Sequence, residues 1–166
     1  MSGIIGKKID IYEVTGRIGK GGMGVVYRGK DTLLDRDVAL KFMDFSLAED
    51  KGLLKRFQDE AKALERLNYP NIVTVLTMRP TDYVLCIVME LIEGETLADR
   101  LHRSGALPPS EVGHIFTQLL SAVGHAHKAK IFHRDLKPMN VMLTRESVVK
   151  VLDFGLAKSK RRFLPQ

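Results

Sequence analysis

The chain has 166 residues, of which 45% are hydrophobic and 28% are charged, and this composition is typical of a soluble globular protein. Its longest apolar run, residues 84–89, is far too short to cross a bilayer, and its start lacks the apolar segment of a signal peptide, so we expect a cytoplasmic location. The formal net charge of +6 does not indicate a nucleic-acid-binding protein, because basic residues are mixed with acidic ones except at residues 158–162, where we expect a solvated tail.

A glycine-rich stretch, residues 16–29, follows a weak strand candidate at residues 9–14. Its glycines permit a tight turn that brings bare backbone N–H groups close to phosphate oxygens. These glycines are Gly19, Gly21 and Gly24. In a dinucleotide-binding unit the third glycine of such a pattern starts a helix. Here the β-branched and aromatic run 25–27 comes next instead, so we expect a returning strand and a hairpin that covers a phosphate group.

A second strand is predicted at residues 38–42, after a polar turn at residues 31–37. Lys41 is the only cation in this strand. A solvated lysine on an edge strand is the alternative reading, but the spacing from the glycines favours a phosphate ligand. Residues 49–67 then carry apolar side chains at helical spacing and predict an amphipathic helix of about five turns. Glu60 lies at the edge of the apolar face of this helix, from which an acid can reach a buried cation.

The helix ends at residues 69–71, because the residue before a proline is pushed out of the α region. Two strands are predicted next, at residues 72–78, which alternate, and at residues 83–89, which are continuously apolar, as in a strand that is buried on both faces. Cys86, the single cysteine, lies in the second strand and cannot form an internal disulfide. We expect a small buried core residue there and a reducing compartment around the protein. Residues 90–94 end the sheet.

Two helices are predicted after the sheet. Thr96 and Asp99 form a capping pair that starts a short helix, and residues 107–111 introduce a longer one with proline and an acid in its first turn. The expected apolar face of the longer helix comprises Val112, Phe116, Leu119, Val123 and Ala126. The histidines of this segment are His114, His125 and His127. The last two are two positions apart and lie on different faces of a helix, so we expect surface or core histidines and no metal site.

The strongest chemical pattern is the stretch 131–140, IFHRDLKPMN, followed by Asp153, Phe154 and Gly155. Together these residues supply two carboxylates, two cations and an amide, the set that can hold a metal-bound triphosphate against a hydroxyl. Residues 141–143 and 148–152 flank the loop as short apolar strands. From residue 133 to residue 140 the stretch fits the pattern H-R-D-L-x-x-x-N at every fixed position.

On these motifs, and on the glycine stretch and Lys41, the chain resembles the protein kinases from about residue 11 to residue 158. The strings GGMG and HRDLKP are most similar to those of bacterial serine/threonine kinases. The resemblance implies an α+β two-lobed kinase fold. The expected parts are a small lobe of about five antiparallel strands and one helix at residues 11–90, the start of the helical large lobe at residues 91–158, and a basic tail at residues 159–166. Since no activation loop or A-P-E motif follows residue 158, we expect a truncated kinase domain.

The resemblance also implies that ATP and Mg²⁺ are the cofactors. The expected nucleotide-binding residues are Ile18, Gly19, Lys20, Gly21, Gly22, Met23, Gly24, Val26, Ala39, Lys41, Met89, Glu90, Ile92 and Met142. Val26 would pack on the adenine ring, and Met142 would lie beneath it. Met89 would be the gatekeeper at the back of the pocket. Backbone groups of Glu90 and Ile92, in a hinge at residues 90–94, would hydrogen-bond the adenine edge.

By the same resemblance the catalytic residues are Asp135, Lys137, Lys41 and Glu60, and the metal ligands are Asn140 and Asp153. Asp135 would accept or orient the proton of the substrate hydroxyl, and Lys137 would contact the γ-phosphate. Lys41 would pair with the α- and β-phosphates and with Glu60. His133 and Phe154 would be scaffold, while Arg134 would await a phosphate on the activation loop.

The expected function is therefore ATP-dependent transfer of the γ-phosphate to serine or threonine hydroxyls of proteins. The expected partners are ATP and a protein substrate that carries serine or threonine, with no nucleic acid and no membrane segment. Two alternatives stay open: a nucleotide-binding or pseudokinase fragment that acts by docking to a partner, and a small-molecule kinase of related fold. The sequence specifies neither the substrate, nor a regulator, nor the oligomeric state.

Overall fold

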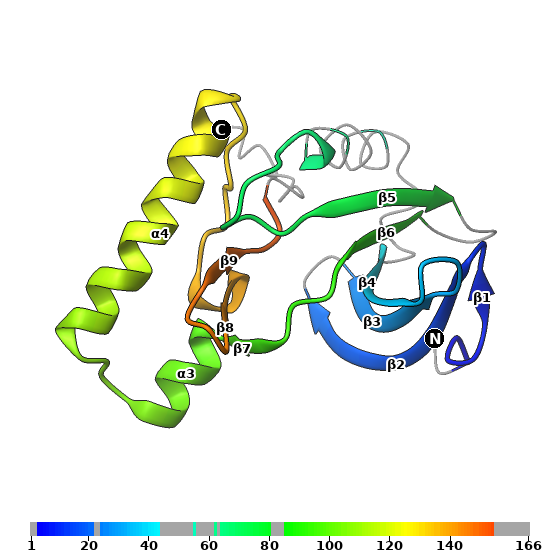
Figure 1. Cartoon of the computed structure of the whole chain (residues 1–166), viewed down its shortest axis with the longest axis horizontal. Helices are drawn as coiled ribbons and strands as arrows, with labels where there is room; N and C mark the ends of the chain where they lie inside the picture. The colour runs from blue at the N-terminus through cyan, green and yellow to red at the C-terminus, as the bar shows by residue number, and fades with distance from the viewer. Residues whose placement is uncertain are drawn as a thin grey trace, which may run out of the picture.

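The computed structural model describes residues 3–21, 24–43, 55, 62, 64–80 and 85–154. Within them the chain forms two parts joined by residues 91–93, a curled antiparallel sheet on one side and two helices with a small sheet on the other (Figure 1). No helix of these residues is long and apolar enough to span a membrane.

The larger sheet has the order β1-β2-β3-β4-β6-β5, and all neighbouring strands in it are antiparallel. Its strands are β1 (Lys8–Ile9), β2 (Tyr12–Gly21), β3 (Gly24–Asp31), β4 (Arg36–Met43), β5 (Val75–Pro80) and β6 (Leu85–Glu90). The strand predicted at residues 9–14 is wrong in its bounds, because Asp10 adopts a positive φ of 55° and separates β1 from β2. A positive φ takes a residue out of the extended region, so one continuous strand cannot pass through it.

The strand predicted at residues 72–78 starts later in the structure, at Val75. Ile72 instead forms an isolated parallel bridge with Val151. β6 agrees with the strand predicted at residues 83–89 over its described part, and residues 83 and 84 lie outside that part. Most of the helix predicted at residues 49–67 also lies outside the described residues. Of those described within it, residues 55, 62, 64 and 65 are helical.

The smaller part begins with β7 (Gly94–Thr96) and α3 (Leu97–Ser104). The predicted capping pair is confirmed, since the Asp99 N–H donates to the Thr96 hydroxyl oxygen at 3.0 Å and the Asp99 carboxylate accepts from the Thr96 N–H. The remaining elements are α4 (Pro109–Lys128), the 3-10 helix η1 (Pro138–Asn140), β8 (Val141–Thr144) and β9 (Val149–Val151). Strands β7, β8 and β9 form an antiparallel sheet that lies between α3, α4 and the larger sheet (Figure 1).

The apolar face predicted for α4 is right at its C-terminal end, where Ala126 is buried and Leu119 packs against the core, but wrong at its N-terminal end. The buried residues of this helix are Ile115, Ala122 and Ala126. Side chains of the predicted face are exposed instead, Val112 by 38% and Phe116 by 52%. The helix has two apolar stripes, and the stripe that contains Ile115 is buried because it packs beside β9.

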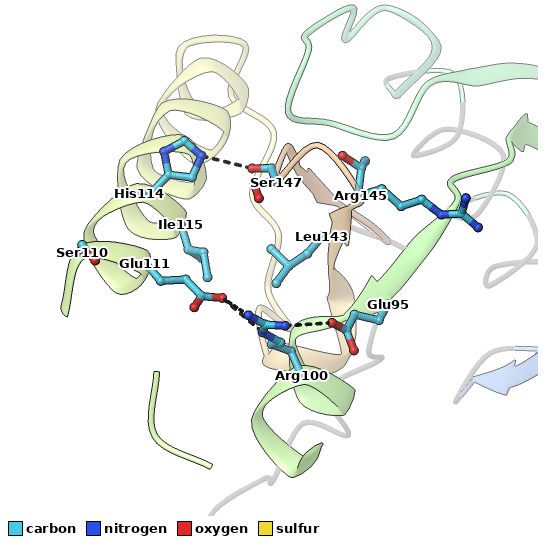
Figure 2. A pocket seen from close by; sticks show the side chains of 10 residues that line it. Glu95, Arg100, Ser110, Glu111, His114, Ile115, Leu143, Arg145 and Ser147 are labelled. Carbon is cyan, nitrogen blue, oxygen red and sulfur yellow. Dashed lines mark hydrogen bonds and ion pairs between the residues drawn. The ribbon is translucent and has the colours of Figure 1, made fainter. Parts of the chain in front are cut away.

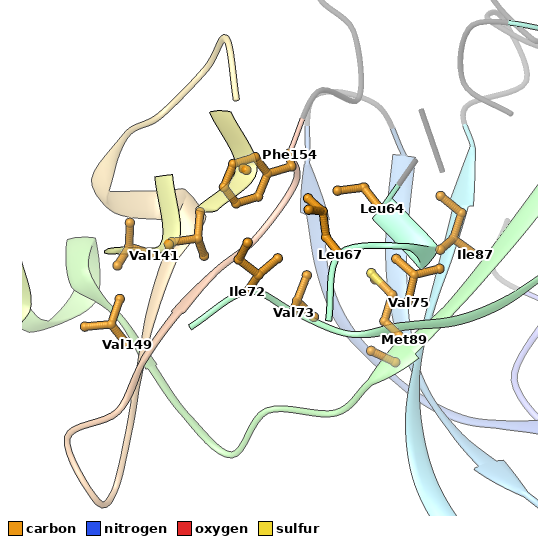
Figure 3. Close-up of a cluster of buried hydrophobic side chains, with 14 of the residues drawn as sticks. Leu64, Leu67, Ile72, Val73, Val75, Ile87, Met89, Val141, Val149 and Phe154 are labelled. Atoms are coloured by element: carbon orange, nitrogen blue, oxygen red, sulfur yellow. The ribbon is translucent and has the colours of Figure 1, made fainter. Parts of the chain in front are cut away.

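One hydrophobic cluster joins the two parts of the chain, as Figure 3 shows. Val141, Val149 and Phe154 lie on one side of it, while Ile87 and Met89 belong to the larger sheet. A second cluster covers the opposite face of the larger sheet and contains Tyr12, Val14, Tyr27, Val38, Leu40, Phe42, Cys86 and Val88. β6 contributes to both clusters, so the strand is buried on both faces, as its continuous apolar run predicts.

Candidate functional site

Lys41 lies on β4, opposite Val26 of β3 and Ile87 of β6, and only 3% of the residue is exposed. A buried ammonium group needs a partner, because transfer of a charge out of water is costly. Among the described residues that partner is Asp153, whose Oδ1 accepts a hydrogen bond from Nζ of Lys41 at 2.5 Å. The ion pair therefore links the larger sheet to the segment that follows β9.

Asp153 has a backbone conformation that is unusual for a residue with a side chain. Its φ is 54°, and Arg134 in the neighbouring loop has a φ of 63°. Left-handed conformations cost free energy in non-glycine residues and persist only where the surrounding contacts hold them. The same conformation occurs at Asp10, Asp35, Lys130 and Ser147, outside these two segments, so the site candidates rest on their contacts and not on this backbone feature.

His133 joins the two segments. Its Nε2 lies 2.7 Å from the Leu152 carbonyl oxygen, its Nδ1 accepts from the Asp135 N–H at 3.3 Å, and its ring packs on Phe154 with centroids 4.9 Å apart. These partners assign the proton to Nε2. Burial lowers the pKa of the His133 imidazole below its ordinary value, although the Leu152 carbonyl opposes this shift. A neutral imidazole therefore holds the loop against Leu152, as the predicted scaffold role requires.

Three predicted residues meet in the loop that runs from residue 133 to residue 140. Nζ of Lys137 donates to Oδ2 of Asp135 at 2.7 Å. The Asn140 side-chain amide donates to the Asp135 backbone carbonyl at 2.8 Å, and the Asn140 carbonyl accepts from the Leu152 N–H at 2.8 Å. The loop thus presents a carboxylate, an ammonium and an amide beside the segment that carries Asp153.

Asn140 and Asp153 are suited to a magnesium ion. Because the amide nitrogen of Asn140 is held by the Asp135 carbonyl, its amide oxygen is the end left for a ligand, and Asp153 adds a carboxylate. Oxygen ligands of this kind are the ones that Mg²⁺ prefers, and Mg²⁺ commonly takes only one or two protein ligands together with water and phosphate oxygens. The described residues contain no group of three or more His, Cys, Asp or Glu side chains that could hold a metal. A nucleotide would supply phosphate oxygens as further ligands beside these two residues.

The predicted hairpin of the glycine stretch is present. In the ladder between β2 and β3, Gly19 pairs with Val26 and Lys20 pairs with Val25. Gly21 pairs with Gly24, whose φ of 156° suits glycine. A register shift between residues 17 and 19 leaves Ile18 outside the ladder and exposed. Gly22 and Met23, at the tip, lie outside the described residues, as does Glu60.

Three of the residues predicted to contact adenine, Val26, Ala39 and Met89, share one face of the larger sheet. Ala39 and Met89 are direct neighbours on β4 and β6, both are buried, and Val26 packs on the same hydrophobic cluster. Ile92 packs on that cluster too, while Met142 lies on β8 opposite Thr96. Val26, Ala39 and Met89 thus share their face of the larger sheet with Lys41, while Met142 belongs to the smaller sheet.

Sequence reasoning missed one ionic contact at this junction. Nζ of Lys150 donates to Oε1 of Glu90 at 2.8 Å, and the same oxygen accepts from the Thr74 N–H at 2.8 Å. The signal that could have revealed it is the single cation in the apolar run 148–152.

A hollow of about 600 Å³ lies away from all these residues, between α3, α4 and the turn that joins β8 to β9. Arg100 lies in it between two carboxylates, 3.7 Å from Glu95 and 3.0 Å from Glu111, and His114 Nε2 lies 3.1 Å from the Ser147 carbonyl oxygen (Figure 2). These charged groups are paired with one another, so the hollow is an ion-paired junction that holds the two helices to the small sheet.

Comparison with known proteins agrees with this geometry. A family model described as protein kinase domain matches residues 12–162. The chain is 41% identical over 155 residues to the serine/threonine-protein kinase PrkC of Bacillus subtilis, which covers 93% of this chain and 24% of PrkC. It is 44% identical over 160 residues to the serine/threonine-protein kinase pkn3 of Myxococcus xanthus, covering 93% of this chain and 29% of pkn3.

A solved structure, the kinase domain of Mycobacterium tuberculosis PknI, aligns with a TM-score of 0.82 and 32% sequence identity. The alignment covers 92% of this chain and 63% of the PknI chain. The chain thus spans about a quarter of the length of the two curated relatives and less than two thirds of the solved one. The fold is protein-kinase-like, with a strand-rich curled sheet as its small lobe.

Proposed function

The chain belongs to the protein kinase domain family, and from this premise we propose that it binds Mg·ATP and transfers the γ-phosphate to serine or threonine hydroxyls of proteins. The observation that carries the proposal is the Lys41–Asp153 ion pair beside the loop that holds Asp135, Lys137 and Asn140. Phosphoryl transfer needs little covalent chemistry from a protein, and depends mainly on positioning and on neutralisation of charge. Cations and carboxylates on two separate segments can do both.

In this proposal the adenine ring lies between Val26 and Ala39 on one side and Met142 on the other. Backbone groups of Glu90 and Ile92 bind its polar edge. The apolar surroundings of Val26 and Ala39, which pack in the same hydrophobic cluster, support this arrangement, because an apolar ring is stabilised when it leaves water for such a surface.

The triphosphate lies beneath the hairpin of β2 and β3 and contacts Lys41. Asn140 and Asp153 hold Mg²⁺, which neutralises phosphate charge when it is bound. Lys41 and Asp153 neutralise each other in the free protein; with nucleotide bound, Lys41 would contact the phosphates and Asp153 would hold the metal.

Asp135 accepts or orients the proton of the incoming hydroxyl. Lys137, whose Nζ lies 2.7 Å from the Asp135 carboxylate, neutralises charge on the transferred phosphoryl group. The string HRDLKP and the printed names of the curated relatives support serine or threonine as the acceptor. A reaction that consumes ATP suits a cytoplasmic location for this part of the chain.

A phosphotransfer assay tests the proposal. The chain, and the chain joined to the segment that follows the matched region in the PknI kinase domain, are incubated with Mg²⁺, γ-labelled ATP and casein. We expect faster transfer by the joined protein than by the chain alone, because the added segment would help to position a peptide. Asp135→Asn should lower the rate by about 10²–10⁴ and leave Mg·ATP affinity nearly unchanged. Asp35→Asn, in an exposed turn, is the matched control.

The outcomes separate the alternatives. Mg·ATP binding without transfer by either protein would favour a nucleotide-binding module that acts by docking. Transfer to small hydroxyl compounds and not to casein would favour a small-molecule kinase. Absence of Mg·ATP binding, or unchanged transfer in Asp135→Asn, would overturn the assignment of the site.

A further inference from the structure

The carboxylate of Glu90 lies at the end of β6, where the larger sheet meets residues 91–93. Its Oε1 accepts two hydrogen bonds, from the Thr74 N–H at 2.8 Å and from Nζ of Lys150 at 2.8 Å. The Glu90 N–H in turn donates to the Thr74 carbonyl at 3.0 Å. Both the backbone and the side chain of the first hinge residue are therefore held by groups outside the hinge.

The segment that contains Thr74 also bonds to β9. The Val73 N–H donates to the Val151 carbonyl at 3.0 Å, and the Val151 N–H donates to the Asn71 carbonyl at 2.8 Å. Residues 71–74 thus lie between the end of β6 and β9, with hydrogen bonds on both sides. Val151 precedes Asp153 by two residues, so the connection runs from the hinge to the segment of the proposed metal ligand.

Lys150 closes this connection with an ion pair. Val149 and Val151 are buried, so the alternation of β9 turns Lys150 to the opposite face, and Met142 lies directly opposite it on β8. Directly opposed residues of an antiparallel pair share a face of the sheet. The backbone of Lys150 therefore lies opposite Met142, the residue expected beneath adenine, and its ammonium group contacts the Glu90 carboxylate at the hinge. Its side chain is only 17% exposed, and a charged group covered to this extent needs its partner.

We propose that Lys150 is a positioning residue of the nucleotide site, which couples the hinge to the segment of Asp153 through the Glu90 carboxylate. This inference rests on the proposed function, and it adds a residue that would touch neither the nucleotide nor the metal. A nucleotide is held at two ends, by adenine contacts at the hinge and by phosphate and metal contacts near Asp153. Once one end of the nucleotide is bound, the contact at its other end forms intramolecularly. The gain in affinity from that second contact depends on how rigidly the protein holds the two subsites at the distance that the nucleotide spans.

Calorimetric titrations with adenosine and with Mg·ATP test this coupling. Adenosine reports on the adenine contacts alone, while Mg·ATP reports on both ends. Couplings between sites are typically 5–150-fold, so Lys150→Met should weaken Mg·ATP binding by about tenfold. The same variant should change adenosine binding by less than about twofold, because the hinge backbone groups remain. Lys150→Arg keeps the charge and should restore the wild-type ratio of the two affinities.

Lys30→Met is the matched control, because Lys30 forms an ion pair of similar length, 2.8 Å, with Asp35 in the turn between β3 and β4. It should leave both affinities unchanged. Equal weakening of adenosine and Mg·ATP in Lys150→Met would overturn the coupling, since it would place the whole effect at the hinge. Unchanged binding of both ligands, or tighter Mg·ATP binding, would overturn it as well.

Hydrogen exchange of the free protein is a second test of the coupling, and it requires no nucleotide. In Lys150→Met the amides of Glu90 and Val151 should exchange faster together, by about fivefold or more, while the amides of β3 stay unchanged. If the wild-type chain bound neither ligand, the proposed function would be wrong. Exchange at these two amides would then decide the structural coupling, and unchanged rates would overturn it.

Discussion

Nζ of Lys41 lies 2.5 Å from Oδ1 of Asp153, although 112 positions separate the two residues in the chain. The two ends of this ion pair differ in their access to water. The lysine is buried, whereas 35% of the aspartate side chain is exposed. Water can therefore solvate the carboxylate when its partner is removed, but it cannot solvate the ammonium, and substitutions at the two ends should differ in their effect.

Asp153→Asn should lower the free energy of unfolding by about 3 kcal/mol, because it removes the carboxylate that, within the described part of the chain, pairs with a buried ammonium. Lys41→Met should change it by less than about 1 kcal/mol, because methionine fills the space and the carboxylate is partly hydrated. Urea denaturation of the two variants measures the difference. Equal effects would show that another carboxylate holds Lys41, and Glu60 is the predicted candidate outside the described residues.

Mg·ATP should raise the stability of the wild-type chain. Binding to the native state alone adds RT ln(1 + [L]/Kd), which is about 2.7 kcal/mol at a hundredfold excess over Kd. A thermal melt at millimolar Mg·ATP should show an upward shift that is lost in Lys41→Met. Lys128→Met, at the exposed end of α4, should keep it. A shift of the same size in both variants would contradict the role of Lys41 in phosphate binding.

His133 should make the protein sensitive to acid. Burial lowers the pKa of its imidazole below the ordinary 6.5, so both folded and unfolded chains hold it neutral above that pH. As the pH falls below 6.5, the unfolded chain takes up a proton that the folded chain refuses, and stability decreases toward the lower folded pKa. We expect His133→Gln to flatten the fall in unfolding free energy between about pH 7 and about pH 5.

His102→Gln, on the exposed surface of α3, is the control for this measurement and should keep the wild-type slope. A wild-type slope in His133→Gln would mean that other groups cause the acid sensitivity.

Cys86 should resist thiol reagents in the folded protein. The residue is fully buried, and burial raises the pKa of its thiol to about 12, so almost no thiolate forms near neutral pH. A disulfide reagent should react with the native chain at least about a hundredfold more slowly than with the chain in denaturant. Cys86→Ala corrects for the background. A fast reaction in native buffer would show that β6 opens readily.

The exposed stripe of α4 should promote association. Phe116 is 52% exposed and Leu120 67%, and both follow Val112 at intervals of four residues. Contiguous apolar patches on a surface favour self-association and dye binding. Phe116→Glu with Leu120→Lys should reduce the fluorescence of a hydrophobic dye and the sedimentation coefficient at high concentration. Thr117→Glu, one position from the stripe, should reduce neither.

Local patterns in the sequence predicted most of the elements and the chemical groups of the site. The Thr96–Asp99 cap, the hairpin that follows Gly21, and the loop from His133 to Asn140 all depend on residues a few positions apart. Short-range sterics and hydrogen bonds act at that distance, so a sequence pattern is sufficient to predict them. The break at Asp10 was missed because the apolar pattern does not reveal a positive φ, and the start of β5 at Val75 was missed because it depends on pairing with β6.

The tertiary structure decided what the sequence left ambiguous. Periodicity showed that α4 is apolar on part of its surface, but only packing beside β9 determined that Ile115 is buried and Phe116 is not. The sequence predicted Lys41 and Asp153 as site residues without pairing them, and it assigned no role to Lys150. Burial and ion pairing depend on distances between segments that are remote in the chain, and those distances exist only after the two parts have packed together.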